Sequence, residues 1–243
     1  MARPLKIGIQ QIGYLPWLGF FDQIYRCDKF VLHIDVQFDR HSWRNRNRIR
    51  TRGGWRWLTV PVCTKGFFGQ NIKETRISNR ESWFKKHWLN IRHNYLEARF
   101  FNKYAYFFEE TFLCKKWEFL VDLDLYIINW CLKQLDISTE IIISSQIKSR
   151  STKTEGVIAI CKELGADSYL SASAGRNYLD EDRLDAEGIG LEYQDYKHPV
   201  YQQAYPGFLS HLSIIDLLFN AGEESLSILS GGADEDSGSG ICS

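Results

Sequence analysis

The stretch IGIQQIGYLPWLGFFDQI, residues 7–24, sets the architecture at the start of the chain. Its first three residues form an apolar run typical of a buried strand, and Leu18, Phe21 and Tyr25 then recur at helical spacing. The loop between the two segments carries two amides, a phenol and an indole: Gln10, Gln11, Tyr14 and Trp17. A plain strand-to-helix connection needs none of these side chains, so the sequence predicts that this loop binds a ligand.

The rest of the chain continues the alternation of strands and helices. Strands are expected at Leu5–Ile9, Phe30–Ile34, Trp57–Val62, Glu140–Ser145, Ser168–Ala172 and Gly190–Tyr193. Helices are expected at Trp17–Arg26, from an N-cap at Ser82 to about Glu110, and at 117–135, Thr152–Leu164 and Leu212–Asn220. This order predicts an α/β fold, a mainly parallel sheet flanked by helices with a long helical insertion in the middle. Residues 1–229 should form one domain, and the acidic, Gly/Ser-rich residues 230–243 a disordered tail.

Composition and short motifs narrow the function classes. Lys plus Arg equals Asp plus Glu at 30 each, so no net charge draws the chain to nucleic acid or to a membrane. The six cysteines form no C-x-x-C pair, which argues against structural zinc and against a disulfide framework, and no metal site is expected. The chain has no apolar run long enough to span a membrane and no signal peptide at its start, so we expect a cytoplasmic protein. Walker, G-x-G-x-x-G and G-x-S-x-G motifs are also missing from the sequence.

Positive charge is concentrated in DVQFDRHSWRNRNRIRTRGGWRW, residues 35–57. No Asp or Glu occurs from residue 40 to 73, and the planar guanidinium group of arginine suits phosphate oxygens. The sequence therefore predicts an anion site at Arg40, Arg44, Arg46 and Arg48, with Trp43 as a stacking ring and Asn45 as a neutral donor. A solvated basic loop is the alternative, and it is the better explanation for any single arginine of the cluster.

Further candidate residues follow the predicted strands. Asp35 and Gln37 come just after the strand that ends at Ile34, and SASAGRNYLD (171–180) follows a later strand. Because the carboxyl ends of parallel strands share one edge of a sheet, these loops should meet the first loop there. Asp35 is the candidate general base, with a structural ion pair to an arginine as the alternative. Gly175 could bring its backbone amide to a phosphate, although small residues after a strand often form only a turn.

Asp124 and His33 are polar residues at positions where the pattern predicts burial. Asp124 lies on the apolar stripe of the helix at 117–135, so it needs a partner unless that part of the stripe is wet. His33 lies inside a predicted strand and is expected in the core.

Four segments together resemble the WbqC-like family of bacterial proteins: QQIGYLPWLGFFDQI, DVQFDRHSWRNRNRIRT, WRWLTVPV and LSIIDLLFN. The resemblance runs from about Lys6 to Gly222. It implies a link to O-antigen and other surface-polysaccharide gene clusters, and a suggested role as an amino-acid (glycine) transferase to a sugar. The positions that it carries over are Gln11, Tyr14, Pro16, Trp17, Asp35, Gln37, Trp43, Asn45, Arg46, Arg48, Gly175, Tyr178, Asp216 and Asn220.

The chain departs from the family pattern at one position in the first loop. Family members commonly read His-Gln-Pro where this chain reads Gln10-Gln11-Ile12, and an amide cannot carry a proton near neutral pH. If that position is catalytic, Gln10 acts there by hydrogen bonding alone. The strand, loop and helix order is also similar to nucleotidyltransferase-like, Rossmann-like domains, which bind ATP through an H-x-G-H motif. This chain keeps only the glycine of that motif, at Gly19.

The expected ligand is therefore a nucleotide-linked sugar or another phosphorylated small molecule. Tyr14 and Trp17 would stack on its sugar or base, Gln10 and Gln11 would bond its hydroxyl groups, and the arginines would take its phosphates. Gln37 and Tyr178 are further substrate-binding candidates. The expected function is aminoacyl transfer to an amino sugar. An ATP-using nucleotidyltransferase-like enzyme and a non-catalytic binding protein stay open as alternatives.

Overall fold

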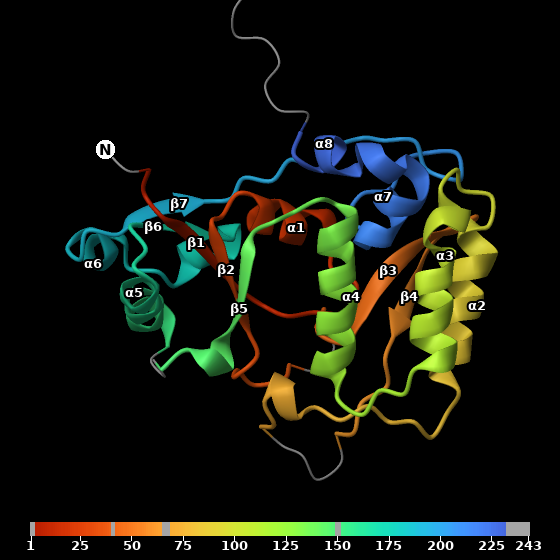
Figure 1. Ribbon diagram of the computed structural model, residues 1–243, viewed down its shortest axis with the longest axis horizontal. Coiled ribbons are helices and arrows are strands. Elements are labelled where there is room, and N and C mark those ends of the chain that lie inside the picture. Colours follow the sequence, from red (N-terminus) through yellow and green to blue (C-terminus); the bar gives the residue numbers. More distant parts are fainter. Residues whose placement is uncertain (1–2, 40–41, 65–68, 149–151, 232–243) are drawn as a thin grey trace, which may run out of the picture.

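The computed structural model describes residues 3–39, 42–64, 69–148 and 152–231, and it is built around a five-stranded sheet (Figure 1). The strand order is β5-β2-β1-β6-β7, and every neighbouring pair is parallel. The strands are β1 (Lys6–Gln11), β2 (Lys29–His33), β5 (Glu140–Ile143), β6 (Ser168–Ser171) and β7 (Gly190–Tyr193). This confirms the predicted α/β fold with a mainly parallel sheet.

The strand order reverses at the centre of the sheet. From β1 the chain adds β2 and β5 on one side, whereas β6 and β7 follow on the other. Helices must therefore leave the carboxyl ends of β1 and β6 in opposite directions, which opens a crevice between those ends. Gln10 and Gln11, the last residues of β1, lie at this point.

Two apolar cores cover the two faces of the sheet. Alternate residues of β2 point to opposite faces, so Phe30 and Leu32 belong to the larger core and Val31 to the smaller one. The smaller core packs α5 (Lys153–Leu164) and α6 (Glu181–Asp185) against the sheet. The larger core joins α1 (Leu18–Tyr25) to the helices of the insertion and to the last helices of the chain. Figure 1 shows α5 and α6 grouped on the side of the sheet away from α2 and α3.

The Arg-rich segment forms a strand, although no strand is expected there from the sequence. β3 (Arg46–Thr51) and β4 (Gly54–Thr59) form a separate antiparallel hairpin, and the strand predicted at 57–62 overlaps β4 only at residues 57–59. Asn47 and Ile49 are buried on one face, whereas Arg46 and Arg48 are half-exposed on the other. The alternation of a strand is thus present, but its outward positions are all arginines.

The predicted helical insertion is confirmed, although the segment from residue 83 to 110 forms two helices rather than one. They are α2 (Trp83–Tyr95) and α3 (Phe101–Glu109), followed by a π-helical turn η2 (Glu110–Cys114) and α4 (Leu120–Gln134). The break comes from tertiary structure, because the amide of Phe100 donates to the carbonyl oxygen of Phe219 at 2.9 Å. Ser82 precedes α2 as predicted, but its side chain makes no capping hydrogen bond.

The described part of the chain closes with two short helices, the second of which packs against α1. These are α7 (Ile214–Ala221) and α8 (Ser225–Leu229). The remaining short helical turns are η1 (Ile72–Glu74), η3 (Ser144–Gln146), η4 (Ser173–Asn177) and η5 (Gly222–Glu224). No helix within the described ranges has the length and apolar character needed to cross a membrane. Residues 232–243, most of the predicted tail, lie outside the described residues.

Candidate functional site

Three segments that are distant in sequence meet beside the carboxyl end of β1. The amide of Tyr14 in the first loop donates to the carbonyl oxygen of Arg44 at 3.1 Å. The amide of Ile214, at the start of α7, donates to the carbonyl oxygen of Pro16 at 2.8 Å. The first loop is therefore held on one side by the Arg-rich segment and on the other by the segment that leads into α7.

Two glycines explain why the first loop can pack so closely. A Cβ atom on Gly13 would lie 2.8 Å from the carbonyl oxygen of Trp43, and one on Gly19 would lie 2.4 Å from the indole ring of Trp17. Any larger residue at Gly13 would push the Arg-rich segment away. Any larger residue at Gly19 would displace the Trp17 ring from the first turn of α1.

A cavity of about 640 Å³ opens between the carboxyl ends of β1 and β6, at the crevice where the strand order reverses. Its size suits a small-molecule ligand. The amino-terminal end of α5 forms one wall and the loop after β6 another. The lining residues include Gln10, Gln11, His33, Arg44, Thr152, Lys153, Gly156, Tyr169, Gly175 and Tyr178.

A second cavity, of about 310 Å³, shares four lining residues with the first: Gln10, Gln11, Trp17 and Arg44. Its other walls are mainly apolar and aromatic, with Pro16, Phe20 and Trp43 among them. The ring of His211 also lines it and stacks on Trp17 with centroids 5.3 Å apart and planes 13° apart. We call the two together the paired cavity.

The charge of the paired cavity is one-sided. Arg44 and Lys153 line it, and none of its described lining residues is acidic. The guanidinium group of Arg44 donates to the carbonyl oxygens of Gln11 and Ile12 at 2.9 Å each. Burial lowers the pKa of Arg44, whereas the nearby charges of Asp124 and Asp39 raise it. Anions are therefore favoured here, and the amino-terminal end of α5 adds to that preference. Within the described ranges, no group of three or more His, Cys, Asp or Glu is placed to hold a metal ion.

Unusual backbone conformations gather at the same place. Leu15, Lys153 and His211 have φ angles of 46°, 53° and 59°, a region that non-glycine residues seldom adopt. Lys153 and His211 line the paired cavity, and Leu15 belongs to the loop beside it. Such strained residues persist where the surrounding structure holds them, and they are frequent at functional sites.

Gln10 is fixed at the junction of the two cavities. Its side-chain amide donates to the side-chain oxygen of Gln23 at 2.7 Å, and Gln23 in turn donates to the carbonyl oxygen of Leu170 at 2.8 Å. This chain of bonds links β1, α1 and β6 below the cavity floor. Gln10 therefore has a defined orientation toward any ligand, although it cannot carry a proton.

Two of the predicted ligand-binding residues lie in the interior instead. Tyr14 is fully buried, its hydroxyl group is 2.8 Å from Nδ1 of His87, and burial raises its pKa well above the ordinary value. Asn45 is buried too, and its side chain donates to the carbonyl oxygen of Val60 at 2.7 Å. In this conformation neither residue can reach a ligand in the paired cavity.

The predicted general base Asp35 lies outside the paired cavity lining. Its carboxylate bonds to Nζ of Lys73 at 2.5 Å and to the hydroxyl group of Ser144 at 2.6 Å. This arrangement favours a structural ion pair, the alternative to a general base, although the partner of Asp35 is a lysine and not the expected arginine. Gln37 is exposed and pairs with Asn71 through a backbone bridge, also away from the two cavities.

The four predicted phosphate-binding arginines are separated in the structure. Arg44 lines both cavities, whereas Arg46 and Arg48 lie on the outer face of the hairpin, and Arg40 falls outside the described residues. Arg48 borders the site, because its guanidinium group donates to the carbonyl oxygen of His211 at 3.1 Å. Trp43 lies between Arg44 and the two arginines on the hairpin, because it lines the smaller cavity and also faces Arg48.

Gly175 and Tyr178 both line the larger cavity. The amide of Gly175 already donates to the carbonyl oxygen of Ala172 at 2.8 Å, so it does not offer the predicted phosphate contact. A Cβ atom at Gly175 would lie only 2.0 Å from Oγ of Ser171, so the glycine is needed for packing. Tyr178 is half-exposed, and partial burial raises the pKa of its hydroxyl group.

Sequence reasoning missed three titratable residues of the paired cavity. His33, expected in the core, ends β2 and is half-buried in the cavity wall, where burial lowers its pKa. Lys153 begins the helix after β5, a position at which the βαβ rule could have identified it. His211 reaches the site from the far end of the chain, and no local motif signals it.

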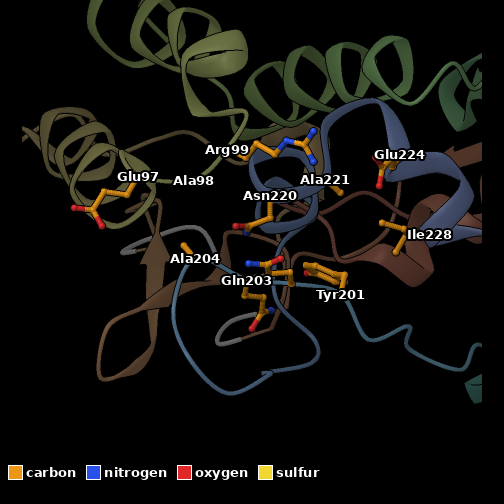
Figure 2. A pocket seen from close by; sticks show the side chains of 11 residues that line it. Glu97, Ala98, Arg99, Tyr201, Gln203, Ala204, Asn220, Ala221, Glu224 and Ile228 are labelled. Carbon is orange, nitrogen blue, oxygen red and sulfur yellow. The ribbon is translucent and has the colours of Figure 1, made fainter.

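A third cavity, of about 320 Å³, lies between the α2–α3 turn, residues 201–204 and the end of α7 (Figure 2). Asn220, one of the positions carried over by resemblance, lines it. Its charges are mixed, because Glu97 and Glu224 face it together with Arg99. The amide of Asn220 already donates to the carbonyl oxygen of Asp216 at 2.7 Å. We therefore place the candidate site in the paired cavity.

Comparisons with known proteins give one family and one curated relative. The chain matches the WbqC-like protein family over residues 11–228. It is 37% identical over 221 residues to the uncharacterized protein Rv1507c of Mycobacterium tuberculosis. The aligned residues cover 90% of this chain and 95% of that protein. No solved structure shows a significant match. The chain belongs to the WbqC-like protein family.

Proposed function

We propose that the paired cavity binds a nucleotide-linked sugar or a closely related phosphorylated molecule. The observation that carries this proposal is the position of Arg44, which lines both cavities where the strand order of the parallel sheet reverses. Ligands of open α/β sheets bind at such points. Lys153 and the amino-terminal end of α5 would face the phosphates from the opposite wall.

The smaller cavity would hold a ring of the ligand. Trp17, Trp43 and His211 offer aromatic faces, and Phe20 closes the apolar wall. Gln10 and Gln11, at the junction, would bond to hydroxyl groups of the sugar. A nucleotide sugar has both the anionic part and the rings that this arrangement requires.

Family membership extends the proposal to a reaction: transfer of an amino acid such as glycine to an amino sugar, in the cytoplasm, during O-antigen or surface-polysaccharide biosynthesis. In that reaction the amino nitrogen of the sugar forms a bond to the carbonyl carbon of an activated aminoacyl ester or thioester. The bond from that carbon to the donor's oxygen or sulfur breaks, the donor's alcohol or thiol leaves with the electrons of that bond, and the nitrogen loses a proton. We assign the proton-accepting role to His211, which lines the smaller cavity. Asp35, the base expected from the sequence, is held by Lys73 and Ser144 outside it.

Calorimetric titration with UDP-, GDP- and dTDP-sugars and with ATP tests the binding step. Lys153→Asn removes one charge and keeps a residue that tolerates a positive φ. Loss of a hydrogen bond to a charged group costs about 1.5–3 kcal/mol, so the dissociation constant should rise roughly tenfold or more. Lys133→Asn, an exposed change on α4, is the matched control and should leave binding unchanged. Wild type that binds none of these ligands would refute the proposal.

Turnover assays then separate the three candidate activities. Aminoacyl transfer that is lost in His211→Asn, while ligand binding is only weakened by the loss of one ring, supports the transferase. Release of pyrophosphate from ATP supports a nucleotidyltransferase-like enzyme, for which the same cavity at the strand reversal is suitable. Binding without any turnover identifies a non-catalytic binding protein.

A further inference from the structure

The outer face of the β3–β4 hairpin exposes several large aromatic rings. Trp43 and Trp55 are each 46% exposed, and Trp57 lies between them with ring centroids 5.1 Å and 5.5 Å away. Arg46 and Arg48 stand among these rings. We call these five residues the Trp–Arg face. Apolar side chains that are gathered on a surface in this way mark interaction sites more often than isolated ones do.

The same face carries a strong local positive charge. Residues 42–59 contain six arginines and no acidic residue, and although Arg44 and Arg50 are held inside the fold by backbone carbonyls, Arg46 and Arg48 stand on this face. Arg52 is exposed at the hairpin turn, and within the described ranges neither it nor Arg48 forms an ion pair. The zero net charge of the whole chain hides this concentration. The partner of the Trp–Arg face should therefore be anionic.

The packing of the rings distinguishes between anionic partners. Nucleic-acid bases stack on open aromatic faces. Here the guanidinium group of Arg46 already lies 4.5 Å from the centroid of the Trp57 ring, and Trp55 meets Trp57 edge to face at 81°. Trp43 is tilted by 54° against Trp57. No pair of these rings forms a parallel platform, so partners that stack ring on ring are disfavoured.

Tryptophan with arginine is the combination that suits a membrane surface. Indole rings settle at the level of the lipid headgroups, and clustered arginines attract anionic headgroups. We propose that the Trp–Arg face docks the protein on an anionic membrane surface. Trp43 also lines the smaller cavity, so docking places that cavity next to the headgroup layer.

Sedimentation with lipid vesicles tests the docking surface. Wild type should pellet with vesicles of phosphatidylcholine plus phosphatidylglycerol, and much less with phosphatidylcholine alone or at high salt. Arg52→Glu changes the local charge by two, and each charge near the surface alters binding about fivefold. Trp55→Ala should weaken association several-fold. Neither residue lines the paired cavity, so calorimetric binding of a nucleotide sugar should stay unchanged in both variants.

Matched controls keep the test specific. Tyr106→Ala removes an aromatic ring that is 73% exposed on α3, and Arg80→Glu reverses an exposed charge on another loop. Both should pellet as wild type does. Docking is refuted if wild type ignores the anionic vesicles, or if the controls lose association as strongly as Trp55→Ala and Arg52→Glu. It is also refuted if wild type does not bind vesicles but binds a single-stranded oligonucleotide or an acidic oligosaccharide, and Trp55→Ala abolishes that binding.

Discussion

Two helical aspartates, Asp124 in α4 and Asp216 in α7, are both fully buried, but their surroundings differ completely. The carboxylate of Asp216 accepts hydrogen bonds at 2.8 Å from the hydroxyl groups of Tyr95 and Tyr201 and from the side-chain amide of Gln203. We call these four residues the Asp216 cluster. Neither carboxyl oxygen of Asp124 has a hydrogen-bond partner in the described part of the chain.

The difference determines the protonation state of each carboxyl group. Burial raises the pKa of Asp216 to about 6, and the three donors limit that rise. Burial raises the pKa of Asp124 well above its ordinary value, and only the charge of Arg44 opposes it. Near neutral pH Asp216 is therefore mostly ionised, whereas burial holds Asp124 much more strongly toward its protonated form. Burial alone does not define the role of an acidic residue, because the donors around it decide whether it keeps its charge.

The two residues also affect the candidate site differently. The Asp216 cluster ties residues 201–203 to α2 and α7, and it fixes both ends of the segment that carries His211 to Trp17. Asp124 lies close enough to Arg44 for their charges to interact, although no direct salt bridge joins them.

The largest effect should come from Asp216→Ala. The substitution leaves two hydroxyl groups and one amide buried without their acceptor, and each unpaired group costs about 1–3 kcal/mol. We expect the free energy of unfolding in urea to fall by about 3–5 kcal/mol. Asp122→Ala, an exposed change on α4, should alter it by less than about 0.5 kcal/mol. Equal losses in the two variants would contradict the comparison.

The second prediction concerns pH. The pKa of Asp216 is about 6 in the folded protein and about 3.9 in the unfolded chain, so between these values the folded state binds more protons. The contribution of Asp216 to the free energy of unfolding is therefore fully present below pH 4, and it falls by about 3 kcal/mol in total as the pH rises through 6. His87 acts in the opposite direction, because burial lowers its pKa to about 4. Its contribution is present above pH 6.5 and is lost as the pH falls through 4.

The contributions of Asp216 and His87 to the free energy of unfolding offset each other between pH 4 and 6.5, whereas the raised pKa of Asp124 makes wild type lose stability as the pH rises over this range. Asp216→Asn removes the contribution of Asp216, so the free energy of unfolding of the variant relative to wild type should rise with pH over that range by about 3 kcal/mol. Urea denaturation at a series of pH values measures both slopes. Parallel curves for wild type and variant would show that Asp216 does not titrate in this range.

The third prediction removes a single donor. Tyr201→Phe takes one hydroxyl group from the Asp216 carboxylate and leaves the other two donors in place. A hydrogen bond to a charged group contributes about 1.5–3 kcal/mol, and the remaining donors should keep the loss near the lower value, about 1.5 kcal/mol. Tyr205→Phe, in the same segment and without a hydrogen bond to Asp216, is the control. A loss as large as that of Asp216→Ala would mean that Tyr201 alone holds the segment.

Secondary structure was predictable from the sequence where it depends on local patterns, and not where it depends on tertiary contacts. The strands of the main sheet were predictable because buried parallel strands are continuous apolar runs, as in residues 30–34 and 140–145. The strand Arg46–Thr51 was not, since its outward positions are arginines that hide the alternation. The break between α2 and α3 depends on a contact between Phe100 and Phe219, which no local pattern encodes.

The candidate site was predictable to a similar extent. Gln10, Trp17 and Arg44 follow from the rule that loops at the carboxyl ends of parallel strands form the ligand crevice. Tyr14 was misplaced because a tyrosine in a loop is as suitable for the core as for a ligand. His211 was missed because it enters from the last segment of the chain, through contacts that only the folded structure creates.

The smallest effect should come from Asp124→Asn. Asparagine has nearly the shape of a protonated aspartate, so the free energy of unfolding in urea near neutral pH should change by less than about 1 kcal/mol. Asp216→Asn, the same substitution in the ionised cluster, should cost more, because it places amide protons against the amide of Gln203. If Asp124→Asn is the more damaging of the two, Asp124 is ionised and serves as the counter-charge that keeps Arg44 in the cavity wall. Binding of the nucleotide sugar by Asp124→Asn would then weaken together with its free energy of unfolding. Both buried carboxylates would then act as charged groups that hold the candidate site in place.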